Sequence, residues 1–207
     1  MKKAIIYSFG WLVLTFLAGC HQTSKPLSQP FEAVEVPGKE WNAGDIFFDK
    51  STSRWKLKKD SSNVSGKIIS YFQHGEIAKI IPVYEGKKEG IQLTYFIDGK
   101  LRFSEQFVNN KLHGTVKKWT NAEGYQLLAE LQYNDGKLHG LQKQWFASGE
   151  LHKVLQMDNG KENGLQKAYR KNGALYANYE AINGRTFGMR RTELCYELDD
   201  EEVVYKN

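Results

Sequence analysis

The chain has 207 residues, a formal net charge of +5 at pH 7 and only two cysteines. Two cysteines cannot build the disulfide framework that staples small secreted scaffolds. The mild and dispersed positive charge argues against nucleic acid as a partner, because that function requires a concentrated basic face.

The first residues predict an exported protein. Met1-Lys2-Lys3 is followed by an apolar run over residues 4–16 and by Leu17-Ala18-Gly19-Cys20. The run is too short to cross a bilayer, so residues 1–19 are interpreted as a secretory signal peptide. Its removal deletes two lysines and no acid, which lowers the net charge to about +3.

The last four residues of this region resemble the lipobox of bacterial lipoproteins. The resemblance implies cleavage before Cys20, lipidation of its sulfur and a membrane anchor. With His21 and not aspartate next, it also implies transfer to the outer membrane, with the protein facing the periplasm or the cell surface. The alternative is an ordinary signal peptide with a chance cysteine. Cys195, in an apolar stretch near the C-terminus, is interpreted as a small core residue.

Residues 20–37 contain three of the four prolines, Pro26, Pro30 and Pro37. They predict an extended tether, stiffened locally by polyproline-like geometry. Residues 38–62 contain two strand-like runs, 45–49 and 54–57, and predict one β-hairpin that caps the array that follows.

Residues 63–193 are dominated by a glycine that returns every 24 to 26 residues. These glycines are Gly66, Gly90, Gly114, Gly140, Gly164 and Gly188. An aromatic residue stands five positions after each of the first five: Tyr71, Tyr95, Trp119, Trp145 and Tyr169. A base stands three positions before the later five: Lys87, Lys111, Lys137, Lys161 and Arg185.

Each of these units predicts one β-hairpin. Polar and apolar residues alternate with a period of two, and a turn signal recurs about every dozen residues, which excludes helices. A second repeated column requires a positive φ at the turns: Gly86, Asn110, Gly136, Gly160 and Gly184. The predicted fold is all-β, an elongated antiparallel meander of about six hairpins, with the last strand and an acidic tail in residues 194–207.

Residues 133–140 and 145–151, Tyr-Asn-Asp-Gly-Lys-Leu-His-Gly and Trp-Phe-Ala-Ser-Gly-Glu-Leu, resemble the variant MORN repeat. The array as a whole resembles bacterial YwqK-type antitoxin or immunity proteins over about residues 60–190. The resemblance implies a single-layer sheet of consecutive hairpins and a role in binding another protein. The departures are Asn110 in the glycine column, one inserted residue before Gly124 and a weak last unit.

Alternation predicts two different faces of the sheet. Apolar residues of the second strands, such as Leu131 and Tyr133, predict one buried face. In the first strands the aromatic column shares a side with Leu141, Leu165 and the lysines, whereas the opposite side is mostly polar, with Gln92, Gln142, Gln166, Lys118 and Gln144. Trp145 is expected to pack against Leu155 and Tyr133.

The candidate binding face combines bases with aromatics: Lys117, Trp119, Lys143, Trp145, Lys167 and Tyr169. Such a surface could dock an acidic protein, anionic headgroups or a glycan. It could equally be a soluble sheet surface on which lysine stems lie across aromatic rings. Both interpretations stay open. The acidic residues 197–202 are interpreted as a solvated end that shields the last strand.

The sequence contains no convincing catalytic or metal motif. His113 and His139 share a column with Glu89, Asn163 and Phe187, which indicates a position beside the turn and not a ligand. No P-loop or nucleophile elbow accompanies the Gly-Lys pairs. We therefore expect no enzyme activity, no metal and no cofactor.

These observations predict a lipid-anchored, monomeric repeat protein that binds a partner protein of unknown identity and perhaps neutralises a toxin. The alternative is an envelope structural protein that binds anionic lipid or cell-wall glycan.

Overall fold

The computed structural model describes residues 35–122, 124–189, 197–199 and 202–204. The predictions for the signal peptide, Cys20, most of the tether and Cys195 lie outside these residues. Within them, no helix has the length and apolarity needed to span a membrane.

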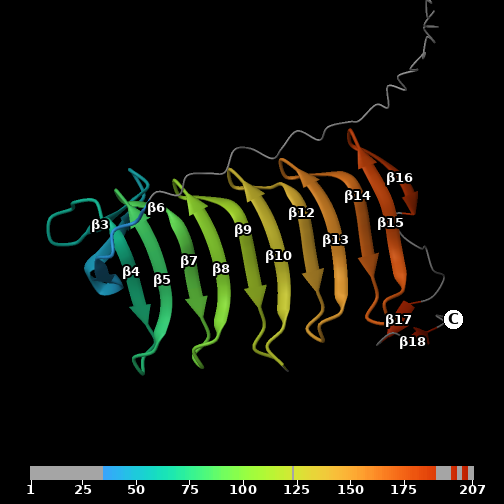
Figure 1. Cartoon of the computed structure of the whole chain (residues 1–207), viewed down its shortest axis with the longest axis horizontal. Coiled ribbons are helices and arrows are strands. Elements are labelled where there is room, and N and C mark those ends of the chain that lie inside the picture. The colour runs from blue at the N-terminus through green and yellow to red at the C-terminus, as the bar shows by residue number, and fades with distance from the viewer. Residues whose placement is uncertain (1–34, 123, 190–196, 200–201, 205–207) are drawn as a thin grey trace, which may run out of the picture. The chain divides into compact units, whose positions relative to one another are not determined.

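The predicted antiparallel meander is confirmed (Figure 1). Successive hairpins form one 14-stranded sheet with the order β1-β4-β5-β7-β8-β9-β10-β12-β13-β14-β15-β16, with β6 paired to β5 and β11 to β10. Its strands are β1 (Glu40–Asn42), β4 (Gly66–Tyr71), β5 (Ile77–Tyr84), β6 (Lys87–Lys88), β7 (Gly90–Tyr95), β8 (Leu101–Val108), β9 (Lys111–Trp119), β10 (Leu127–Asn134), β11 (Lys137–Leu138), β12 (Gly140–Trp145), β13 (Leu151–Asp158), β14 (Lys161–Tyr169), β15 (Leu175–Ile182) and β16 (Arg185–Met189).

The first strand departs from the antiparallel pattern. β1 pairs with β4 in parallel, with Trp41 opposite Ile68. The indole N–H of Trp41 donates to the Ser65 carbonyl at 2.9 Å, and the Lys67 N–H donates to the Lys39 carbonyl at 2.8 Å. This short strand therefore lies along the outer side of the first array strand, where an open edge would otherwise invite pairing with other chains.

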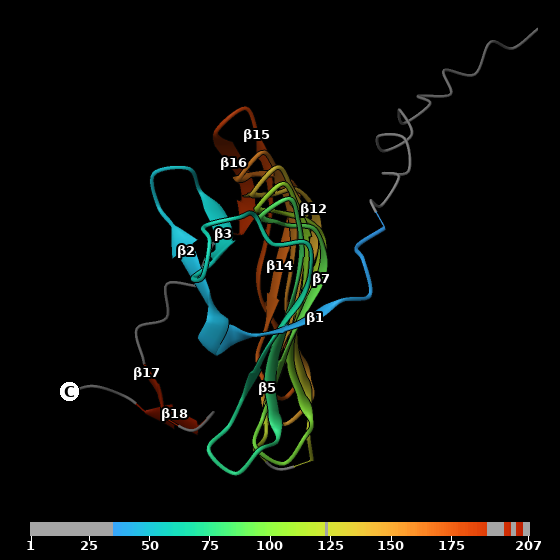
Figure 2. The same cartoon turned by 90° about the vertical axis from the view of Figure 1, so that its left-hand side faces the viewer.

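The predicted hairpin is also present, as β2 (Ile46–Asp49) and β3 (Arg54–Leu57), after a short 3-10 turn at Ala43–Asp45. It forms a sheet of its own and lies to one side of the large sheet (Figure 2). It therefore does not cover the edge of the array as expected, because β1 pairs with β4 there. Its contact with β4 and β5 is the main hydrophobic core of the described residues, built from Ile46, Leu57, Val64, Ile68 and Val83.

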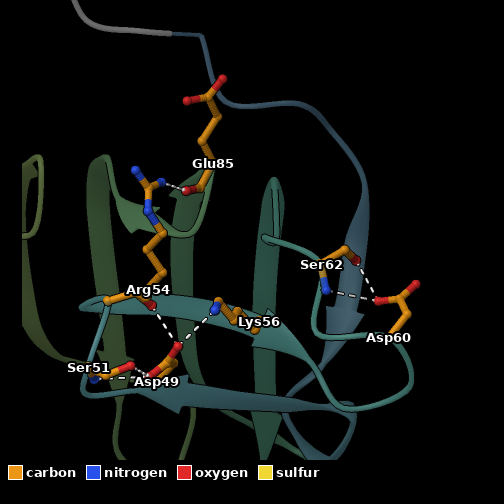
Figure 3. A network of polar contacts seen from close by, with 8 residues as sticks. Asp49, Ser51, Arg54, Lys56, Asp60, Ser62 and Glu85 are labelled. Atoms are coloured by element: carbon orange, nitrogen blue, oxygen red, sulfur yellow. Dashed lines mark hydrogen bonds and ion pairs between the residues drawn. The ribbon is translucent and has the colours of Figure 1, made fainter.

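Polar contacts fasten this hairpin to the array (Figure 3). The Trp55 N–H donates to the Gly86 carbonyl at 2.7 Å, and the Arg54 guanidinium donates to the Glu85 carbonyl in the same turn. Within the hairpin, Lys56 binds the Asp49 carboxylate at 2.7 Å. The hairpin thus holds the first turn of the array as well as its first two strands.

The turns that join neighbouring units have two residues, both with positive φ. Asp135 and Gly136, for example, have φ of 48° and 80°, the type I′ geometry that fits the twist of a hairpin. The Gly136 N–H donates to the Leu112 carbonyl of the preceding unit at 2.8 Å. Lys111, from the column of bases, donates to the Asp135 carboxylate at 2.7 Å. Both repeated columns therefore connect one unit to the next.

The repeated glycines stand at irregularities in the strand register. In the β8–β9 pair, Phe107 lies opposite Leu112 but Glu105 lies opposite Val116, so β9 carries two extra residues around Gly114. Gly114 has φ +87° there. Such a bulge requires a left-handed residue, and this explains the strongest signal in the sequence.

The described residues of the acidic tail, β17 (Glu197–Asp199) and β18 (Glu202–Val204), pair with each other and not with the large sheet.

Candidate functional site

The strand register divides the sheet into two faces. We call the face that carries Gln92, Gln142 and Gln166 the glutamine face, and the face that carries Lys117, Lys143 and Lys167 the lysine face. Leu155 lies directly opposite Gln142 and Gln166, so the apolar second-strand residues share the glutamine face. Residues that pair directly point to the same side of a sheet.

The glutamines are among the most buried side chains of the described residues, with 4%, 1% and 0% exposed for Gln92, Gln142 and Gln166. The reason is the bulge. The Gln142 amide accepts a hydrogen bond from the Gln132 N–H at 2.9 Å and donates to the Gln132 carbonyl at 3.1 Å. It therefore provides a partner for the Gln132 N–H at the bulge and a second donor to the Gln132 carbonyl, which also accepts from the His139 N–H at 2.9 Å. A column that is polar in sequence is thus part of the interior.

The same register corrects the expected environment of Trp145. Leu151, and not Leu155, lies opposite Trp145, across a bulge near the end of the strand. Tyr133 pairs with Gly114 and Leu138. The prediction that Trp145 packs on Leu155 and Tyr133 is wrong. It was based on alternation within each strand, which does not tell which residues of two neighbouring strands lie opposite each other.

Gln92 belongs to a charged cluster on the glutamine face. It accepts from the Lys88 ammonium at 2.7 Å and donates to Glu105 at 2.5 Å. The ammonium lies 4.4 Å from the Phe107 ring centre. Burial lowers the pKa of Lys88, and the nearby Glu105 opposes that shift. We interpret this cluster as a paired interior group.

On the lysine face, the three lysines lie in one row across five neighbouring strands. In order across the strands, the row consists of Lys117, Glu130, Lys143, Val154 and Lys167, and each residue lies directly opposite the next. Lys117 forms an ion pair with Glu130 at 3.3 Å. Lys143 and Lys167 have no acidic partner within the described part of the chain.

Beside these two lysines lies a shallow groove of about 250 Å³. Its lining consists of Leu141, Val154, Gln156, Leu165, Lys167 and Tyr169. Leu141 and Leu165 are 43% and 49% exposed, so two neighbouring first strands present apolar side chains to solvent at the groove. Val154 adds an aliphatic side chain to the groove. The matching position in the second strands of the other units holds Ile80, Ser104, Glu130 or Asn178.

The six predicted site residues are thus only partly brought together. Lys167 and Tyr169 line the groove, and Lys143 lies in the row beside it. Trp119 instead stacks on Tyr125, with ring centres 6.4 Å apart and planes inclined by 6°. The site residue that sequence reasoning missed is Val154, whose signal was an aliphatic side chain in a column that holds Ser104, Glu130 and Asn178 in three other units.

The column that contains the histidines contacts the next turn. Glu89 accepts from the Asn109 N–H at 2.9 Å, and His139 Nδ1 lies 3.1 Å from the Asp158 carboxylate. Over the described residues, no three His, Cys, Asp or Glu side chains gather as a metal site.

No protein-family model matches this chain, and no curated protein is significantly similar to it. The fold and this face define a class only: an all-β hairpin-repeat protein with a groove on one face of its sheet.

Proposed function

We propose that this protein is a non-enzymatic binding module that holds a partner protein on its lysine face, at the groove between Leu141 and Leu165. The observation that carries the proposal is the coincidence, in one place, of two exposed leucines, an aliphatic Val154 and two lysines without acidic partners.

The physical case rests on what contact would gain. Burying each exposed leucine contributes up to about 2 kcal/mol, and the groove offers a concave apolar surface for an anchoring side chain. Lys143 and Lys167 would then select an acidic rim around that anchor and speed the encounter. The partner surface we expect is therefore apolar at its centre and acidic at its edge.

The proposal also includes a lipid anchor at Cys20 and, on the resemblance to YwqK-type proteins, a toxin as the partner to be neutralised. Anchoring would place the lysine face near the envelope, where an incoming or resident protein could be captured.

A photo-crosslinking residue at Leu165 tests the docking surface. We expect it to capture one protein in intact cells, identified by mass spectrometry. The matched control is the same residue at Ile97, which is 57% exposed but lies in a turn away from the groove. Equal capture from both positions, or none from Leu165, would reject this surface.

Charge reversal gives a second readout. Lys143→Glu with Lys167→Glu should abolish capture. It should change the free energy of unfolding by only about 0 to 1 kcal/mol, because both half-buried lysines lack an ion pair among the described residues. Lys137→Glu with Lys161→Glu makes the same charge change at exposed turn positions of the same units and should leave capture intact. If the wild-type protein instead binds anionic vesicles or cell-wall glycan, and the Lys143→Glu, Lys167→Glu variant does not, the envelope-binding alternative is supported.

A further inference from the structure

Equivalent side chains recur on the lysine face at a fixed distance, from one first strand to the next. Lys143 and Lys167 are two strands apart in one cross-strand row, with Val154 between them. Strands are spaced by 4.7–4.9 Å, so their Cα atoms are about 9.5 Å apart. Leu141 and Leu165, on the same two strands, are separated by the same step.

One backbone conformation presents side chains at this interval. A polyproline II helix rises 3.1 Å per residue and has three residues per turn, so every third side chain returns to the same side after about 9.3 Å. A β-strand returns after about 6.7 Å and an α-helix turn after about 5.4 Å. A polyproline II segment with a period of three is therefore the ligand whose repeat matches the face.

The sequence of the chain itself contains a segment with this period. Over residues 31–37, apolar Phe31, Val34 and Pro37 are three apart, and so are the acids Glu32 and Glu35. Pro30 precedes this segment and Pro37 is its last residue, and both prolines favour polyproline II geometry. The structure describes Glu35 and Pro37 as exposed and outside any helix or strand. The two acids match the spacing of Lys143 and Lys167, and the apolar residues match Leu141 and Leu165.

The length of chain between this segment and β1 determines whether the segment can reach the lysine face of its own copy. β1 is seven strand positions from β12 in the sheet, about 34 Å. The fully extended chain spans at most about 18 Å from Glu40 to Glu35 and about 29 Å from Glu40 to Glu32. Lys167, on β14, lies two strands beyond Lys143, so neither acid reaches its lysine within one copy. The segment cannot reach the groove of its own sheet.

We propose that residues 31–37 of one copy dock on the lysine face of a second copy. Glu32 and Glu35 pair with Lys143 and Lys167, and the Phe31, Val34 and Pro37 side lies against the groove. This contact rests on the proposed function in that it uses the same face, but here a second copy of the chain occupies the face. Each copy has one such segment and one such face, so the contact links copies either reciprocally, as a closed dimer, or in sequence, as open chains. In both arrangements a bound partner would compete with the segment.

The test uses the full chain, purified in detergent, and a fluorescent peptide of residues 30–38, with binding measured by anisotropy. We expect saturable binding, weakened about tenfold or more by Lys143→Glu with Lys167→Glu, as for two lost ion pairs with reversed charge. A peptide with Glu32→Lys and Glu35→Lys should bind wild type poorly and bind the double variant well. Lys137→Glu with Lys161→Glu should bind the wild-type peptide normally.

Sedimentation velocity provides the second measurement. The mass of the wild-type chain should rise above that of a monomer as the concentration increases, and that of the double variant should not. Failure of the charge swap to restore binding, or a wild-type monomer at every concentration, overturns the inference. If Leu165 crosslinks a different protein while the peptide does not bind, only this inference fails. If the peptide binds and cells yield no other partner, only the proposed function fails.

Discussion

At the scale of single residues, the structure depends on a few polar side chains that complete the backbone. Gln142 and Gln166 bind main-chain groups at the bulges of their units. Asn110, the only non-glycine in its turn column, accepts from the Lys88 N–H at 2.7 Å and donates to the Ser53 carbonyl at 2.8 Å. It therefore joins the second turn to the capping hairpin, which glycine could not do.

Gln142→Ala should reduce the free energy of unfolding by about 1 to 3 kcal/mol, because it leaves the Gln132 N–H without a partner, while the Gln132 carbonyl keeps its bond from the His139 N–H. Urea unfolding measures the change. Gln144→Ala, in the same strand but less buried, should cost well under half as much. Equal costs for the two variants would show that the buried amide has no special role.

Asp49 gives a pH dependence. Hydrogen bonds from Lys56, then Ser51 and Thr52, hold the pKa of its carboxyl well below the usual range. A carboxyl with a depressed folded pKa contributes its full stability above the unfolded pKa of about 3.9 and loses it as the pH falls toward the folded pKa. The unfolding free energy should therefore decline below about pH 4, and less steeply in Asp49→Asn. A parallel decline in both proteins, in urea melts across that range, would contradict this.

At the scale of elements, the bulges and turns set how closely segments approach. Gly66 and Gly90 occupy the same repeated position with φ of +130° and +93°. A Cβ on Gly66 would lie against the Lys39 carbonyl, far inside any normal contact, whereas one on Gly90 would meet Pro82 at 3.7 Å. Of these two glycines, only Gly66 lies against the backbone of the segment that leads into β1.

Gly66→Ala should therefore destabilise the protein more than Gly90→Ala, although both pay for a positive φ. The additional loss should appear as faster hydrogen exchange of the Lys67 amide, which bonds Lys39 across the β1–β4 pair. Unchanged protection of that amide would mean that β1 adjusts without losing its pairing.

At the scale of the whole molecule, a single-layer array is stabilised mainly by contacts between neighbouring units, and the capping hairpin supplies a true core at the first of them. Leu57 is 6% exposed in that core, whereas Leu175, near the other end of the sheet, is 41% exposed.

Leu57→Ala should cost about 2 to 4 kcal/mol, and Leu175→Ala less than about 1 kcal/mol. Chemical unfolding of both variants checks the difference. Similar costs would indicate that the two ends are equally well packed.

Membrane attachment is a separate prediction for the whole molecule. Cys20→Ser should release the protein from membranes, since the acyl chains that contribute about 0.8 kcal/mol per buried methylene would be absent. Fractionation of cells decides the matter. A variant that still sediments with membranes after a salt wash would refute the lipoprotein interpretation.

The sequence predicted much of this architecture, because the turns, bulges and strands depend on the conformation of a few neighbouring residues. A bulge that needs positive φ requires glycine wherever it recurs, so the spacing of Gly140 and Gly164 predicted the number and length of the hairpins. The runs in residues 45–49 and 54–57 predicted the capping hairpin, because strand and turn preferences act over a few residues.

The register between strands was decided only in three dimensions. Alternation assigns sides within one strand, but the bulges shift the pairing between strands, so it could not say that Gln142 shares a buried face with Leu155 or that Trp145 lies opposite Leu151. It also could not place β1 beside β4, because that pair joins segments separated by the capping hairpin. The sequence by itself determined the repeat and its turns, which depend on local backbone geometry. The tertiary structure decided which face is interior and where the groove lies, because both depend on contacts between strands.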